Sequence, residues 1–256
     1  MIIGIYFSGT GNSRHAVDKL VHLLDEKAPI YPLEDKHIVE YIKQADTIYF
    51  SYPTQFSNAP IYVRDFIKSH DIFKDKKIFC ICTMGAFSGD GSGCTARLFK
   101  KKKAKIIGGL HVKMVDSVCD SKLLKKSDEV NREILRKADI KIEKAANDIK
   151  NNHYPKQGLS FFSHMLGLFG QRLWFYHESK SYSSKLTINP NLCIGCGLCS
   201  KICPLNNITM KDGKPVPHNH CTKCYRCISH CPKKAITLLG KEVVEQTTYE
   251  KFASQD

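Results

Sequence analysis

Eight cysteines in the last third of the chain have the spacing of ligands for iron–sulfur clusters. One run, Cys193-x-x-Cys196-x-x-Cys199-x-x-x-Cys203-Pro204, recurs 28 residues later as Cys221-x-x-Cys224-x-x-Cys227-x-x-x-Cys231-Pro232. Three thiolates separated by two residues can bind three corners of one cubane, and the fourth, beyond a short turn, binds the other cluster. The pattern therefore predicts two [4Fe–4S] clusters, one on Cys193, Cys196, Cys199 and Cys231 and one on Cys221, Cys224, Cys227 and Cys203.

Zinc and disulfides are the other common uses of clustered cysteines. Zinc sites use two well-separated cysteine pairs rather than two complete sets of four. Disulfides require an oxidising compartment, but the apolar start Met1–Phe7 is short and lacks the basic leading region of an export signal. Because eight of the twelve cysteines fall within residues 193–231, we expect metal-binding thiols in a cytoplasmic protein.

The repeat extends past the cysteines into a domain-sized segment. Ile188 and Val216 each lie five residues before a first cysteine, and Asp212-Gly213 reads as the tip of a tight turn between short strands. About residues 185–240 resemble the bacterial two-[4Fe–4S] ferredoxins. The resemblance implies a small α+β domain that holds both clusters.

A second candidate site lies at the start of the chain, where an apolar strand ends in small and hydroxyl residues. The loop is Ser8-Gly9-Thr10-Gly11-Asn12-Ser13, and an amphipathic stretch with Val17, Leu20 and Leu24 on one face follows it. Loop hydroxyls, backbone N–H groups and a helix N-terminus together favour a phosphate. The dinucleotide fingerprint and the Walker lysine are absent, which argues against NAD and ATP on this loop.

Further elements are expected to place this loop at the edge of a parallel sheet. Near-continuous apolar runs predict buried strands at Thr47–Ser51, Lys77–Thr83 and Lys105–Val112, with a weaker strand near Pro29–Leu33. Helices are expected near residues 60–70, at 91–103 and at Asp128–Lys150, the last with Ser127 as N-cap and Val130 on its apolar face. This alternation predicts an α/β fold with a doubly wound, five-stranded parallel sheet and ligands at the carboxyl ends of its strands.

The segment Tyr6–Ser13 resembles the flavodoxin phosphate-binding loop, and the resemblance extends over about residues 1–150. It implies FMN, with Ser8, Thr10, Gly11, Asn12 and Ser13 around the phosphate. Two later loops, Tyr52–Pro60 and Thr83–Gly93, stand where that family holds the flavin ring. Their candidate residues are Pro53, Thr54, Gln55, Phe56, Met84, Gly85, Ala86, Phe87 and Gly91. Phe56 or Phe87 would cover a ring face, or either is instead a core or lid residue.

The remaining segments suggest how the chain is divided. We expect a flavodoxin-like domain over residues 1–151, an apolar connector at 152–184, the ferredoxin domain at 185–240 and a polar tail at 241–256. The connector is too apolar for a flexible linker, so we expect it to pack between the domains. Membrane-surface contact by this segment is the less favoured alternative, and no run of residues is long enough to span a bilayer.

A formal net charge of +14 raises the question of partners. The lysines are scattered and accompany no nucleic-acid motif, so we expect no nucleic acid and favour an acidic redox protein. The whole chain is similar to flavodoxin–ferredoxin fusion proteins, which implies a carrier of electrons between FMN, two [4Fe–4S] clusters and that partner. Two alternatives stay open: an FMN-dependent oxidoreductase whose substrate cavity is roofed by residues 161–176, and a redox- or oxygen-sensing interaction module.

Overall fold

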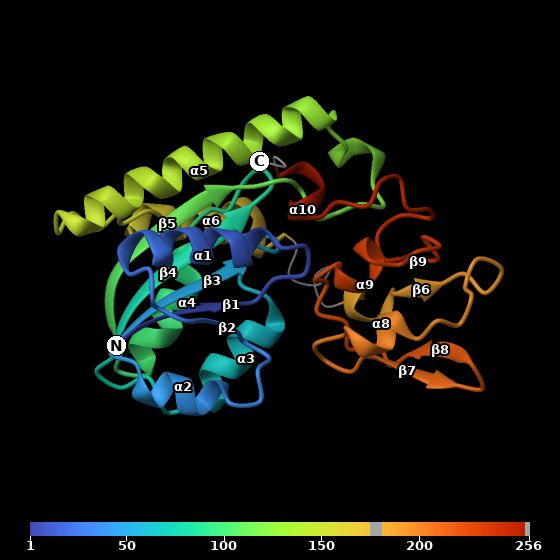
Figure 1. Ribbon diagram of the computed structural model, residues 1–256, viewed down its shortest axis with the longest axis horizontal. Coiled ribbons are helices and arrows are strands. Elements are labelled where there is room, and N and C mark those ends of the chain that lie inside the picture. The colour runs from blue at the N-terminus through green and yellow to red at the C-terminus, as the bar shows by residue number, and fades with distance from the viewer. Residues whose placement is uncertain (175–180, 254–256) are drawn as a thin grey trace.

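Residues 1–150 build a sheet with helices on both faces (Figure 1). The computed structural model describes residues 1–174 and 181–253. All neighbouring strands in the order β2-β1-β3-β4-β5 are parallel, which confirms the predicted doubly wound fold. The strands are β1 (Ile2–Tyr6), β2 (Ile30–Pro32), β3 (Thr47–Pro53), β4 (Lys77–Met84) and β5 (Lys105–Lys113).

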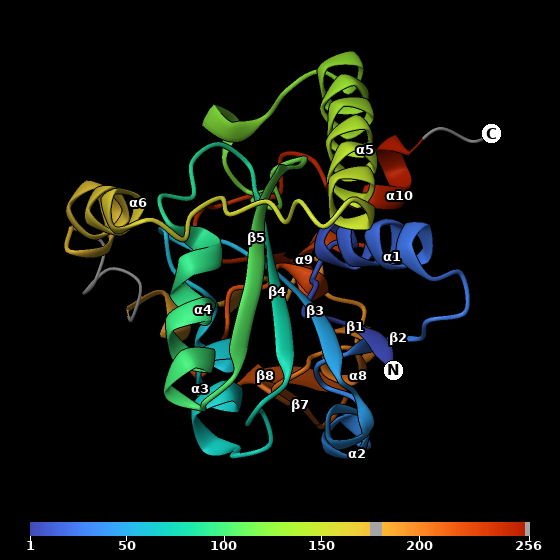
Figure 2. The same ribbon diagram turned by 90° about the vertical axis from the view of Figure 1, so that its left-hand side faces the viewer.

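Two groups of helices cover the sheet, as the edge-on view in Figure 2 shows. One face carries α1 (Asn12–Leu24) and α5 (Asp128–Lys150), and the other carries α2 (Ile38–Gln44), α3 (Ile61–Ser69) and α4 (Gly91–Lys101). Helix α5 begins as predicted, with the Ser127 hydroxyl accepting from the Val130 N–H at 3.4 Å. The prediction that the Val130 side chain joins the apolar face is wrong, because it is 48% exposed in the first turn. Helix α2 was not predicted, since it is short and buries only two side chains.

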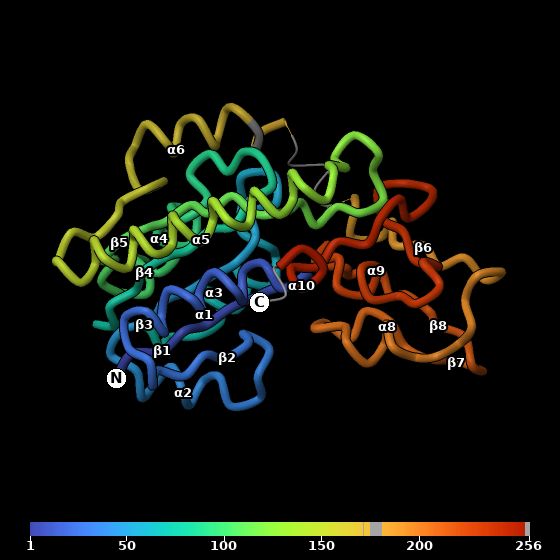
Figure 3. The backbone as a smooth tube through the Cα atoms, turned by 45° about the horizontal axis from the view of Figure 1, so that its top comes forward, coloured from blue at the N-terminus to red at the C-terminus, as the bar shows by residue number. Residues whose placement is uncertain are grey.

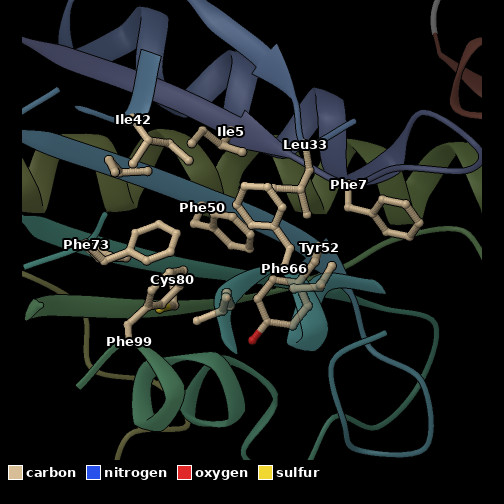
Figure 4. Close-up of a cluster of buried hydrophobic side chains, with 14 of the residues drawn as sticks. Ile5, Phe7, Leu33, Ile42, Phe50, Tyr52, Phe66, Phe73, Cys80 and Phe99 are labelled. Carbon is tan, nitrogen blue, oxygen red and sulfur yellow. The ribbon is translucent and has the colours of Figure 1, made fainter. Parts of the chain in front are cut away.

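The core beneath α2, α3 and α4 combines aliphatic side chains with a group of aromatic rings (Figure 4). Phe99 packs edge-on against Phe50 and Phe73, with ring centroids 5.2 and 4.9 Å away. At the carboxyl end of β3, the hydroxyl of buried Tyr52 donates to the Gly91 carbonyl at 2.5 Å. This contact fixes the start of α4 against the sheet, next to the loops predicted to bind the flavin.

Residues 186–238 form a small second domain beside the carboxyl ends of the strands. Its elements are β6 (Thr187–Ile188), α8 (Leu198–Lys201), β7 (Ile208–Lys211), β8 (Lys214–Pro217), α9 (Arg226–Ser229) and β9 (Ile236–Thr237). Strands β6 and β9 pair antiparallel, as do β7 and β8. The turn between β7 and β8 has φ of 49° at Asp212 and 73° at Gly213, so the Asp-Gly tip is confirmed.

The segment between the domains differs from the expected packed connector. Helix α6 (Phe161–Gly167) continues into a π-helical turn at Leu168–Arg172. Its backbone lies against the first domain, yet Phe161 and Phe162 are 78% and 71% exposed. The expectation that these side chains pack between the domains is therefore wrong, and Phe175 and Tyr176 lie outside the described residues.

The polar tail returns to the first domain and ends in helix α10 (Tyr249–Phe252). Phe252 is 1% exposed and joins the core beneath α1 and α5. Within the described ranges, none of the helices combines the length and apolar character needed to cross a membrane.

Candidate cofactor sites

A cavity of about 360 Å³ opens at the carboxyl ends of β1, β3, β4 and β5. Its volume lies in the range of pockets that hold small molecules and cofactors. Most residues predicted from the three loops line it: Ser8, Thr10, Asn12, Ser13, Pro53, Thr54, Gln55, Phe56, Met84, Gly85, Ala86 and Phe87. Gly11 and Gly91 are not in its wall. Gly91 packs behind the loops, where a Cβ would overlap the Cys82 sulfur, and Gly11 turns the chain into α1 with φ of 90°.

The loop Ser8–Ser13 is held by a side chain at the end of β4 and by one in the loop that follows β5. The Ser13 hydroxyl lies 2.7 Å from that of Thr83, and the Thr10 hydroxyl lies 2.9 Å from that of Ser117. Asn12 donates from Nδ2 to the Val115 carbonyl at 2.8 Å, whereas its buried Oδ1 has no partner in the described structure. The loop therefore offers rotatable hydroxyls and one unsatisfied acceptor at the N-terminus of α1.

The loop after β5 forms a cavity wall that the sequence analysis missed. Residues Met114–Val118 line the cavity. A Cβ on Gly85 would overlap the Asp116 carboxylate, so the absence of a side chain at Gly85 lets the two loops meet. Burial raises the pKa of Asp116, although the Val118 N–H donates to its Oδ1 at 2.9 Å. The sequence did carry a signal for this loop, because every loop at the carboxyl end of a strand in a doubly wound sheet is a candidate for binding a ligand.

The second domain closes the cavity with Lys223, Cys224 and Tyr225. A Cβ on Gly9 would overlap the carbonyl of Cys224, so the Ser8–Ser13 loop and this cysteine are in direct backbone contact. Gln55 reinforces the contact by donating from Nε2 to the carbonyls of Thr222 and Lys223, at 2.8 and 3.1 Å. One of the predicted cluster ligands is thus part of the predicted flavin site.

Arg226 joins the same two parts of the chain. Its guanidinium donates to the Ser8 carbonyl at 2.7 Å and to the Ile202 carbonyl at 3.3 Å, and it pairs with Glu34. The neighbouring carboxylate raises the pKa of Arg226 despite its burial, so the side chain is charged. The cation therefore ties the Ser8–Ser13 loop to the chain just before Cys203.

The eight clustered cysteines fall into two groups in space. Cys193, Cys196, Cys199 and Cys231 line one small cavity. In the other group, burial is the largest cause that raises the pKa values of Cys221 and Cys227, and nearby thiols that include Cys203 raise them further. Burial also raises the pKa of Cys224 to about 12. In each run, the backbone N–H four residues after the fourth cysteine donates to the sulfur of that cysteine. The Asn207 N–H donates to Cys203 at 3.2 Å, and the Ala235 N–H donates to Cys231 at 3.4 Å. Among the described residues, no three His, Cys, Asp or Glu side chains gather as they would around a single ion.

The tail also contributes to the site, although no sequence pattern in it pointed there. The Tyr249 N–H donates to the Thr10 carbonyl at 2.7 Å, and its ring stacks on His15 with centroids 4.0 Å apart. Thr247 donates to the Asp116 carbonyl at 2.9 Å. Residues 247–252 thereby brace the Ser8–Ser13 loop and the loop after β5 from outside the cavity.

Asp90, at the end of the third cavity loop, anchors the connector. Its fully buried carboxylate pairs with Arg97 at 2.6 Å and Arg172 at 3.0 Å, and it lies 3.1 Å from His164 Nδ1. The Arg172 guanidinium also lies 3.1 Å from the Cys94 sulfur, and burial raises the pKa of that thiol to about 11. Cys94 is therefore a protonated packing residue here rather than a reactive thiolate.

Asp90→Asn should destabilise the protein strongly. It keeps the shape of the side chain but leaves the charge of Arg172 buried without compensation, which costs about 3–5 kcal/mol in comparable buried pairs. Denaturant unfolding measures the loss. Asp71→Asn removes the exposed pair with Lys102 and should change stability little. Equal stability of the Asp90 and Asp71 variants would contradict the anchoring role.

Comparisons with known proteins match the cysteine-rich part of the chain. Residues 186–209 match the family model "4Fe-4S binding domain". One component of the Na(+)-translocating ferredoxin:NAD(+) oxidoreductase complex of Acetobacterium woodii is 45% identical over 56 residues, which are 20% of this chain and 17% of that protein. The uncharacterized protein MJ0749 of Methanocaldococcus jannaschii is 34% identical over 53 residues, 21% of this chain and 20% of its own length. The chain thus spans about a fifth of the length of these relatives.

Solved flavodoxins are similar in fold to part of the chain. The two-electron reduced flavodoxin of Megasphaera elsdenii is 21% identical, with a TM-score of 0.40, over 43% of this chain and 85% of its own. A short-chain flavodoxin associated with a non-canonical PDU bacterial microcompartment is 14% identical, with a TM-score of 0.42, over 60% of this chain and 99% of its own.

The strand order 2-1-3-4-5, with a cavity at the carboxyl ends of the strands, defines the first part as a flavodoxin-like domain. The second part is a 4Fe–4S ferredoxin domain. The chain accordingly joins a flavodoxin-like fold to a 4Fe–4S binding domain.

Proposed function

We propose that this protein carries electrons between an FMN in the cavity, two [4Fe–4S] clusters and a redox protein partner. The observation that carries the proposal is that Cys224, a predicted cluster ligand, forms part of the cavity wall. A flavin exchanges one or two electrons and each cluster exchanges one, so the pair can convert between the two modes. Holding both on one chain also gives a high effective concentration for the exchange.

The residues of the cavity fit FMN. The hydroxyls of Ser8, Thr10 and Ser13 and the N-terminus of α1 suit a phosphate. The unsatisfied Oδ1 of Asn12 can accept from a ribityl hydroxyl. Phe56 and Phe87 both line the wall, and we propose that one of them covers a face of the ring.

The two groups of cysteines fit the crossed assignment of ligands. The group with Cys203 is the inner one, because Cys224 borders the cavity, and the group with Cys231 is the outer one. Around the outer group, Cys196 is exposed and Ile194 is 60% exposed. We therefore place the docking of the protein partner at the outer cluster, from which electrons pass by the inner cluster to the flavin. The net charge of +14 favours an acidic partner.

The alternative function, an FMN-dependent oxidoreductase with a substrate cavity, receives less support. It expected the connector to roof the cavity, but none of residues 161–174 lines it. Asp116 is the acid among the wall residues, and its carboxylate accepts from the Val118 N–H of its own loop.

Anaerobically purified protein should contain about eight irons and one FMN per chain. Reducing the clusters in the absence of a partner should bleach the flavin absorbance, since the inner cluster borders the flavin. A chain that held about one zinc and no iron would refute the ferredoxin part of the proposal. A flavin that stayed oxidised beside fully reduced clusters, at a potential able to reduce it, would refute electron exchange.

A further inference from the structure

Six large apolar side chains between residues 161 and 174 are exposed on the surface. They are Phe161 (78% exposed), Phe162 (71%), Leu166 (49%), Phe169 (55%), Leu173 (54%) and Trp174 (79%). Single apolar side chains are normal on a protein surface, but a group of this size on one short segment marks a site of interaction.

The segment is fixed in this orientation by contacts on its other side. Arg172 and His164 reach inward to the buried Asp90 carboxylate. A Cβ on Gly89 would overlap the Cα of Gly167, so the α6 backbone lies directly on the third cavity loop. Residues 162, 166, 169 and 173 have the spacing of one helix face. The apolar face is therefore directed outward by a rigid anchor.

The mouth of the cavity continues this apolar surface. Ala86, Phe87, Leu124 and Leu239 are the exposed residues of the cavity wall, and all four are apolar. Phe87 also lies beside Gly170, at 3.9 Å from the position of a Cβ there. In Figure 3, α6 and the loop that leads into α5 both rise at the upper edge of the molecule.

That second loop combines an exposed leucine with lysines. Leu123 is 95% exposed, and its neighbours in the chain are Lys122, Leu124, Lys125 and Lys126. Lys122 and Lys125 pair at 3.3 and 3.5 Å with Glu242 and Glu245. Such pairs at the surface are weak, so the lysines can exchange these partners for other anions.

We propose that this face docks the protein on an anionic lipid bilayer, with α6 in the plane of the interface and Leu123 inserted beside it. Outward aromatic side chains accompanied by lysines are the pattern of interfacial binding, where apolar burial and attraction to anionic headgroups add. Protein interfaces, in contrast, are depleted in lysine. Docked in this way, the apolar mouth of the cavity faces the membrane. The proposal does not depend on which cofactor fills the cavity.

The chain's one tryptophan, Trp174, lies on this face and reports contact with lipid. The intact protein with its cofactors should sediment with vesicles that contain phosphatidylglycerol, more weakly with pure phosphatidylcholine, and less as salt is raised. Lipids brominated on their acyl chains should quench the Trp174 fluorescence.

Two pairs of variants distinguish vesicle binding through this face from nonspecific adsorption of the protein. Phe162→Asp should weaken partition into the vesicles by at least about tenfold, whereas Ile140→Asp, at a 50% exposed position on α5, should leave it unchanged. Lys122→Glu should weaken binding to anionic vesicles more than Lys74→Glu, which makes the same charge change at an exposed lysine before β4. Circular dichroism and iron content check that each variant is folded.

Three results would overturn the proposal. The first is no sedimentation with either kind of vesicle, and the second is equal loss in the Phe162 and Ile140 variants. The third is self-association, or capture of a protein partner, that Phe162→Asp abolishes while vesicles stay unbound, because the face would then be a protein interface.

Discussion

Cys203→Ser should remove the inner cluster and leave the outer cluster in place. The flavin should then no longer be reduced by electrons from the outer cluster. Cys203 belongs by sequence to the first cysteine run, yet in space it accompanies the thiols of the second run, whose pKa values it helps to raise. A serine oxygen is a poor replacement for a thiolate on iron, which prefers soft ligands. Iron content should fall from about eight to about four per chain.

Spectroscopy distinguishes which cluster is lost. The reduced variant should retain the signal of one [4Fe–4S] cluster, and its flavin should stay oxidised when that cluster is reduced. Cys231→Ser is the matched control, because Cys231 has the same place in the second run and lies with the outer group. It should lose about the same amount of iron, but its flavin should remain reducible through the inner cluster. Flavin reduction that survives Cys203→Ser and fails in Cys231→Ser would reverse the assignment of inner and outer clusters.

The parts of the fold with strong local patterns were predictable. Continuous apolar runs located β3, β4 and β5, and Ser127 located the start of α5, because burial and capping act on neighbouring residues. Helix α2 and the exposure of Val130 were missed, since a short helix has few core positions and Val130 lies on the exposed side of the first turn of α5.

The same distinction applies to the site. Loops that carry their own composition, such as Ser8–Ser13 and Met84–Phe87, were found and line the cavity. The contributions of Cys224 and Tyr249 depend on how distant segments pack, through backbone contacts that no residue pattern encodes. For the connector, the prediction failed in the other direction. Its apolar composition predicted buried side chains, but composition alone does not determine whether an apolar side chain packs inside the protein or lies exposed on its surface.

Thr10→Glu should abolish the retention of FMN while leaving the iron content unchanged. Thr10 is 3% exposed and its hydroxyl lies 2.9 Å from that of Ser117, at the loop that we propose for the phosphate. Two like charges about 4 Å apart repel by about 4 kcal/mol at the effective dielectric near a protein surface, which corresponds to about a thousandfold in affinity. Titration of the flavin-free protein with FMN, followed by quenching of flavin fluorescence, measures the change.

Thr10→Gln separates charge from size in this test. Glutamine fills the same space without a negative charge, so any loss of affinity that it shows is steric, and the further loss in the glutamate variant is electrostatic. A buried glutamate with a phosphate beside it takes up a proton more readily than a free one, so its pKa rises. The difference between the two variants should therefore shrink as the pH is lowered to about 5 and widen towards about pH 8. Equal affinities of the two variants at every pH would mean that the phosphate binds elsewhere and that the Ser8–Ser13 loop serves only to seat the cluster domain.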